Sequence, residues 1–139
     1  MLFRSAGATL GDYLQELWGV DATFSRGPVV LRGEFFHDGW QVPNVADAAT
    51  DLSGYLEAQT DLAPGVWIAG RIGAIHYDEV AGQPGTRAPW DYDIRRVQLA
   101  GGYRVARSVE VKAEAQRTHS NDPRGADADL LSLQLWCAF

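Results

Sequence analysis

The residue types best suited to binding a metal ion gather in three polar stretches of the chain. They are His76 with Asp78 and Glu79, Asp91 with Asp93, and Asp127 with Asp129. Carboxylates two positions apart share one face of a strand, and calcium prefers the oxygen ligands that loop carboxylates supply. Solvated loop charge is nevertheless the commoner role of such residues, so we expect no metal site and no bound cofactor.

Two other stretches contain residue types that are used in catalysis. His119, Ser120 and Asn121 are adjacent, whereas a nucleophile, its base and an orienting group must converge in space. The pair Gly101-Gly102 lies inside a predicted strand, where glycine eases curvature, and is no phosphate-binding loop. We therefore expect no catalytic residue and no enzymatic activity.

Charge and cysteine content exclude several classes of protein. The 139 residues carry a formal net charge of -6, and Lys112 is the only lysine. A phosphate-binding surface would be basic, so we expect no nucleic-acid partner. With Cys137 as the single cysteine, neither an intrachain disulfide nor a zinc site built on several thiolates can form. No run of residues approaches the roughly 18 apolar positions of a membrane-spanning helix, which excludes helical membrane proteins.

Alternation of apolar and polar residues predicts about seven strands. The predicted strands are Leu17–Arg26, Val29–Phe36, Asp51–Thr60, Val66–Tyr77, Asp91–Val105, Val109–Thr118 and Asp129–Phe139. Each is close to the roughly ten residues that cross a membrane as a tilted β-strand. Residues 1–16 show no strong period, so we expect a loop or short helix there, leading into a β-barrel segment over residues 17–139.

The connections between the predicted strands alternate between two kinds. Tight turns are expected at Arg26, Ala63 and Arg107, and long polar loops at Asp38, Ala81 and Asn121. Transmembrane barrels alternate in this way because one end faces the periplasm and the other the exterior. With the terminal Phe139 at the periplasmic end, all three long loops would be extracellular.

One predicted face of the strands is free of charge, and the other carries the charged residues. The residues expected to face lipid are Val20, Phe24, Leu31, Phe35, Leu56, Ile68, Ile72, Leu99, Tyr103, Val111, Leu133, Leu135 and Phe139. The residues expected to line a pore are Asp21, Arg32, Glu34, Glu57, Arg71, Arg96, Gln98, Arg104, Glu110, Lys112, Glu114 and Gln116. The sequence therefore predicts an all-β protein, an antiparallel up-and-down meander of about seven strands curled into part of a transmembrane β-barrel.

The same alternation also fits a soluble lipocalin-like barrel or a sandwich, in which the apolar face would point inward. Three features favour the membrane. The apolar face is rich in small residues such as Gly54 and Gly70, which would pack a soluble core poorly but suit lipid. Aromatic residues such as Trp18 and Tyr103 fall near strand ends, where the interfacial girdles of membrane barrels lie. The loop alternation, with a final strand that closes on Phe139, is the third feature.

The stretch from about Leu17 to Phe139 resembles the C-terminal part of a porin-type outer-membrane protein, and more loosely the phosphate-selective porin O and P group. The matching text is GVDATFSRGPVVLRGEFF, the strand pair around AGRIGAIHYDEV and WDYDIRRVQLAGGYRV, and the final KAEAQRT and DLLSLQLWCAF. The resemblance implies a bacterial outer-membrane location, contact with outer-membrane lipids and with the barrel-assembly machinery through the C-terminal strand, and it allows a homo-oligomer. Closed bacterial barrels have an even number of strands from eight upward, so the chain would be the last part of a larger barrel.

Three functions remain open from the sequence. The first is a porin-like barrel that lets small polar solutes diffuse; with five cations and five anions on its predicted wall, it would show no anion preference. The second is a non-transporting barrel that acts as an anchor or interacts with partners through its long loops. The third is a soluble barrel that binds a lipid or another small molecule. Conductance in a bilayer separates the first two, and folding as a monomer in buffer without detergent would identify the third.

Overall fold

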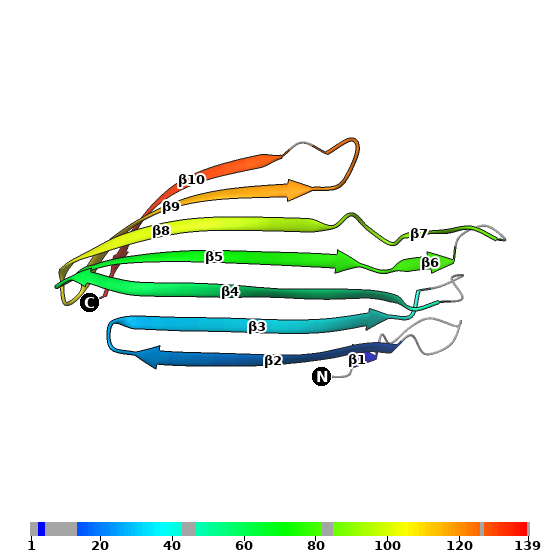
Figure 1. Cartoon of the computed structure of the whole chain (residues 1–139), viewed down its shortest axis with the longest axis horizontal. Helices are drawn as coiled ribbons and strands as arrows, with labels where there is room; N and C mark the ends of the chain where they lie inside the picture. Colours follow the sequence, from blue (N-terminus) through cyan, green and yellow to red (C-terminus); the bar gives the residue numbers. More distant parts are fainter. Residues whose placement is uncertain (1–2, 5–13, 43–46, 82–84, 126, 139) are drawn as a thin grey trace.

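Most of the described chain lies in one antiparallel β-sheet (Figure 1). The structure, a computed structural model, describes residues 3–4, 14–42, 47–81, 85–125 and 127–138. Eight strands form the sheet in the order β1-β2-β3-β4-β5-β8-β9-β10, and a separate hairpin joins β6 to β7. The strands are β1 (Phe3–Arg4), β2 (Leu14–Arg26), β3 (Val29–Trp40), β4 (Ala49–Ala63), β5 (Val66–Tyr77), β6 (Glu79–Ala81), β7 (Arg87–Pro89), β8 (Ile94–Ala106), β9 (Val109–Ser120) and β10 (Ala128–Cys137). The predicted all-β antiparallel meander, with seven long strands, is confirmed.

The two ends of the sheet differ in their connections (Figure 1). At the turn end, β2–β3, β4–β5 and β8–β9 are joined by the two-residue turns Gly27-Pro28, Pro64-Gly65 and Arg107-Ser108. Gly27 and Gly65 have φ angles of 59° and 80°, a left-handed conformation that glycine adopts without strain. The opposite loop end carries the longer connections and the β6–β7 hairpin. The predicted alternation of tight turns and long connections is confirmed.

Several element boundaries differ from those expected. β2 begins at Leu14 instead of Leu17, and Phe3–Arg4 form a strand where a loop or short helix was expected; residues 5–13 lie outside the described part. The long loop predicted at Ala81 contains the β6–β7 hairpin. β8 begins at Ile94 rather than Asp91, which leaves Asp91 and Asp93 in the loop. Cross-strand pairing extends or shortens each strand, and alternation within a single strand does not contain that information.

The register of the sheet aligns the two predicted faces across all seven long strands. One row of cross-strand partners runs through Phe24, Leu31, Ala58, Gly70, Leu99, Ala115 and Leu131. Residues two positions further along each strand form a second row on the same face, because successive side chains point to opposite faces. The neighbouring row on the other side runs through Arg32, Glu57, Arg71, Gln98 and Gln116. An apolar face and a charged face are therefore continuous from β2 to β10.

The sheet is open, and its described part has no hydrophobic interior. β10 pairs only with β9, and β2 pairs with β1 over two residues only. Among the described residues, only Ala49 and Asp51 are buried. The sheet curls on its β9–β10 side but does not close into a barrel (Figure 1). A single sheet with both faces uncovered has to find its apolar environment in something other than itself.

Candidate functional site

A row of bonded polar side chains begins on β3 and crosses the charged face. Glu57 on β4 is the direct cross-strand partner of Arg32 on β3 and of Arg71 on β5. Its Oε1 accepts a hydrogen bond from Arg32 Nη1 at 2.6 Å, and its Oε2 accepts one from Arg71 Nη2 at 2.6 Å. The Arg71 guanidinium lies 4.3 Å from the ring centroid of Tyr55, a cation–π contact. Charge-assisted bonds on one side and the ring on the other hold this guanidinium in place.

A second group of bonded polar side chains lies beside the first, on β8 and β9. Gln98 Nε2 donates to Glu114 Oε1 and to Gln116 Oε1, each at 3.0 Å. Lys112 Nζ lies 2.6 Å from Glu114 Oε2. We call the set the polar belt; its members are Arg32, Glu57, Arg71, Gln98, Lys112 and Glu114. The belt therefore consists of two bonded groups, one on β3, β4 and β5 and one on β8 and β9, which lie side by side where Arg71 and Gln98 are cross-strand partners.

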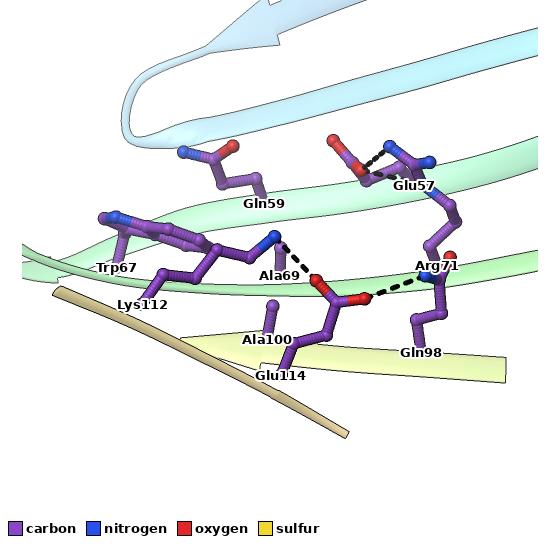
Figure 2. A pocket seen from close by; sticks show the side chains of 9 residues that line it. All are labelled: Glu57, Gln59, Trp67, Ala69, Arg71, Gln98, Ala100, Lys112 and Glu114. Atoms are coloured by element: carbon purple, nitrogen blue, oxygen red, sulfur yellow. Dashed lines mark hydrogen bonds and ion pairs between the residues drawn. The ribbon is translucent and has the colours of Figure 1, made fainter. Parts of the chain in front are cut away.

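The polar belt borders a hollow of about 220 Å³ on the charged face (Figure 2). Its lining comes from β4, β5, β8 and β9 and consists of Glu57, Gln59, Trp67, Ala69, Arg71, Gln98, Ala100, Lys112 and Glu114. Ala69 and Ala100 are direct cross-strand partners, and their small side chains leave the space between the longer ones empty. Two carboxylates and two cations line the hollow, so their formal charges cancel.

Three aromatic rings on the charged face stand beside glycines of neighbouring strands. The cross-strand pairs are Phe36 with Gly19, Tyr55 with Gly73, and Trp67 with Gly102. A Cβ atom on Gly102 would lie 2.5 Å from the Trp67 indole, so this ring occupies the space above the glycine. The indole reaches as far as β9, where Nε1 donates to Glu110 Oε1 at 3.2 Å. Gly102 was expected to ease strand curvature, and its contact in the structure is with this indole.

All twelve predicted pore-lining residues lie on the charged face. Besides the members of the polar belt and Gln116, Arg104 and Glu110 form an ion pair at 3.6 Å. Asp21, Glu34 and Arg96 form no ion pair with any described residue. The structure thus brings most of the predicted set into bonded groups, and of the three charges without an ion pair, Glu34 is still hydrogen-bonded to Tyr55.

The twelve described members of the predicted lipid-facing set lie on the opposite face, while Phe139 is outside the described residues. Leu99 on the central strand β8 is 64% exposed, and Leu133 on the edge strand β10 is 77% exposed. By contrast, the side chains of Glu57 and Glu114 are only 12% and 17% exposed. Large apolar side chains therefore stand exposed on one face, while on the other face these two carboxylates are shielded and the Glu57 partners Arg32 and Arg71 are 41% and 40% exposed.

Charged pairs end the apolar face at the loop end. His76 Nδ1 lies 2.9 Å from Asp93 Oδ2, and His119 Nδ1 lies 2.6 Å from Asp127 Oδ1. Arg117 Nη2 is 3.3 Å from the second oxygen of Asp127. Hydrogen bonds from His76 and the Tyr77 N–H lower the pKa of Asp93, and bonds from His119 and Arg117 lower the pKa of Asp127.

These pairings separate the residues that were considered for metal binding and catalysis. Asp93 bonds to His76 on β5 and does not form a pair of metal ligands with Asp91. Asp78 accepts a hydrogen bond from the Thr50 hydroxyl, and Ser120 Oγ accepts one from the Asp122 N–H. Asp129 lies 3.9 Å from Arg117. Within the described ranges, no three His, Cys, Asp or Glu side chains are grouped so that they could hold a metal ion.

Two features of the site escaped the sequence analysis. Alternation places Trp67 on the charged face, but only charged and amide residues were taken as pore-lining. Arg117 and His119 lie beyond the apolar run of the predicted strand Val109–Thr118. Counting the alternation to the end of β9 would have put both on the apolar face, next to Asp127.

The part of the chain that the structure describes holds no helix capable of crossing a membrane. When the chain is compared with models of protein families, with curated proteins and with solved structures, no match is found.

Proposed function

We propose that the chain forms part of the wall of a porin-like outer-membrane β-barrel, through which small polar solutes diffuse passively. Its apolar face would contact lipid, and its charged face would line a water-filled pore. The observation that carries this proposal is the continuous apolar face, which no other element of the described sheet covers. Leu56, Ile72 and Leu99 lie on middle strands and are 55%, 58% and 64% exposed, whereas a soluble barrel would enclose them.

Strand length supports the proposal. The seven long strands have 10 to 15 residues. At about 3.3 Å per residue, twelve residues span roughly 40 Å, which a tilt near 45° reduces to about 28 Å. This matches the hydrocarbon thickness of a bilayer, in which backbone groups must be satisfied by their own ladder.

Closing such a barrel needs more strands than the described sheet supplies. β2 and β10 both run from the loop end to the turn end, so they cannot pair with each other antiparallel. An odd number of additional strands between them would complete an even-numbered antiparallel barrel. β1 runs antiparallel to β2 and pairs with its first two residues at the loop end, where one such strand would finish. Further chain or further copies would provide the rest, because open edges are not tolerated in lipid.

The charged face suits an aqueous pore without strong charge selectivity. Ion pairs within the polar belt satisfy Glu57, Arg71, Lys112 and Glu114 locally, so no ring of one sign faces the lumen. The bonded side chains would form a hydrated wall of fixed shape. Passage of solutes through it requires no reaction and no cofactor.

Adjacent positions on β8 test which face meets lipid. In a Cys137→Ser background, Leu99→Cys lies on the apolar face and Ala100→Cys on the charged face. Each variant is labelled with a fluorophore and reconstituted in lipid vesicles. A quencher attached to lipid tails should quench the label at position 99, and a water-soluble quencher should act at position 100. The reverse pattern, or access of the aqueous quencher to both labels, would refute the proposed orientation.

Planar-bilayer recordings test the pore. The reconstituted protein should produce discrete, ohmic current steps with little preference between potassium and chloride. A membrane-embedded protein with no steps at any voltage would exclude the porin and leave the anchor. Recovery of a folded monomer from buffer without detergent would instead support the soluble ligand-binding barrel.

A further inference from the structure

We propose that the hollow beside the polar belt binds a neutral sugar. This inference rests on the proposed pore only for the location of the hollow in the pore wall. The binding chemistry itself follows from the side chains that line it (Figure 2).

The charges around the hollow are already compensated. Glu57 is bonded to both Arg32 and Arg71, and Glu114 is bonded to Lys112. A small ion entering the hollow would have to compete with a partner at 2.6 Å in either pair. The four charges that line the hollow are each bonded and sum to zero, and the belt's additional positive charge, Arg32, lies outside the lining, so an uncharged ligand is favoured.

Uncommitted donors and acceptors remain, and they are of both kinds. Gln59 Oε1 accepts from Arg32 Nη1, which leaves the amide NH₂ of Gln59 without a partner among the described residues. Gln98 uses its NH₂ group for Glu114 and Gln116 and keeps its carbonyl oxygen available. The Lys112 ammonium has three N–H donors, of which one serves Glu114. Hydroxyl groups donate and accept at once, so a polyhydroxylated ligand can use this mixture.

The Trp67 indole provides the apolar part of the site. One side of the ring covers Gly102, Nε1 is held by Glu110, and the ring also borders the hollow. The face of an aromatic ring carries negative charge density, which attracts the weakly positive C–H groups on the flat side of a pyranose. A fixed aromatic surface surrounded by planar amides and charged groups matches a ligand with one apolar side and a hydroxylated edge.

Zwitterions and phosphate are the competing ligands. Either would gain most from an unpaired Arg or Lys, whereas Arg71 lies between Glu57 and the Tyr55 ring. Neither would use the indole surface as a pyranose does. The lining therefore favours the sugar.

The test uses maltose as the probe and the reconstituted protein in planar bilayers. Maltose should interrupt the open-channel current in a concentration-dependent manner. Trp67→Ala should weaken this binding about tenfold, because stacking on an indole contributes on the order of one factor of ten. Gln98→Leu, which removes the free carbonyl, should weaken it by a few-fold. Trp18→Ala is the matched control: Trp18 contacts Phe35 and His37 on the apolar face, and its loss should leave maltose binding unchanged.

A second measurement keeps this inference separate from the pore. If no channel opens, the pore proposal fails, and the sugar is then tested by saturable tryptophan-fluorescence change on maltose titration in detergent. The signal should be lost in Trp67→Ala and preserved in Trp18→Ala. If Trp67→Ala does not fold, Trp67→Phe with Gln98→Leu replaces it. Absence of saturable maltose binding to the wild-type protein, or tighter binding of phosphate or glutamine, would overturn the inference.

Discussion

The side chains on the two faces of this sheet differ in what they contact. On the charged face, side chains reach sideways to partners on neighbouring strands, and Glu57 and Glu114 are largely shielded as a result. On the apolar face, side chains such as Leu131 stand out from the sheet and are 82% exposed. Many charged side chains of one face thus bond to each other, while no element of the described sheet covers the apolar face. Substitutions at matched positions on the two faces test this difference.

The largest effect is expected where a charge enters the apolar face in the middle of β10. Leu133→Arg should lower the free energy of unfolding in lipid vesicles by about 2–4 kcal/mol, since an arginine near the bilayer midplane must leave water. Ser132→Arg, on the opposite face of the same strand and directly across from Glu114, should change it by less than about 0.5 kcal/mol. Denaturant titration in vesicles measures both. Equal effects at the two positions would show that neither face meets lipid.

A smaller loss of unfolding free energy is expected when an ion pair of the polar belt is removed. Glu57→Gln leaves Arg32 and Arg71 without their shared carboxylate, in a setting where the Glu57 side chain is only 12% exposed. We expect a loss of about 1–3 kcal/mol, the usual result when partly desolvated charges lose their hydrogen-bond partner. Asp21→Asn is the control, because Asp21 forms no ion pair with a described residue. If the two substitutions cost the same in denaturant titration, the belt does not stabilise the sheet.

Two adjacent glycines of β8 point to opposite faces, so replacing each with alanine shows what one added methyl group does on either face. Gly102→Ala would place its Cβ atom 2.5 Å from the Trp67 indole and displace the ring from Glu110. We expect a loss of about 1–2 kcal/mol and a changed tryptophan emission spectrum. Gly101→Ala points to the other face, where its nearest neighbours are Trp67 O at 3.5 Å and Ile68 Cγ2 at 3.8 Å. It should be neutral or stabilising, because alanine is better than glycine in a strand interior. A stabilising Gly102→Ala would contradict the packed position of the indole.

Much of the fold could be predicted because period-two alternation is a local property. The apolar positions of β3, β5 and β9 identify their faces without knowledge of any partner strand. The breakers Gly27-Pro28 and Pro64-Gly65 mark the turns for the same reason. The predicted strand ends were less accurate, since residues 15–18 and 37–40 are held in the sheet by pairing with each other. The β6–β7 hairpin likewise depends on non-local bonds, including Arg87 to Asp47 at 2.9 Å.

The candidate site was predictable as a list of residues but not as a network. Alternation places Arg32, Glu57 and Arg71 on one face, yet only the register shows that they are direct partners. The pairing of His76 with Asp93 depends on where β8 begins, and the closeness of Trp67 to Gly102 depends on the alignment of β5 with β8. Register is a property of two strands together, so one strand's pattern cannot determine it.

The smallest effect is expected at the loop end, where the apolar face ends in charged pairs. The hydrogen bond from His76 holds the pKa of Asp93 below its ordinary value. A carboxyl group with a depressed pKa contributes stability that is fully present above its unfolded-state pKa, about 3.9, and is lost as pH falls through the folded-state value. Unfolding titrations from pH 7 down to pH 3 should therefore show an acid-side loss in the wild-type protein, reduced in Asp93→Asn. Asp91→Asn, which changes the neighbouring loop carboxylate, is the control and should keep the wild-type pH dependence. Since His76 and Asp93 are partly exposed, the difference should be small compared with the effect of Leu133→Arg, and a larger one would mean that the loop end, rather than the two faces, determines stability.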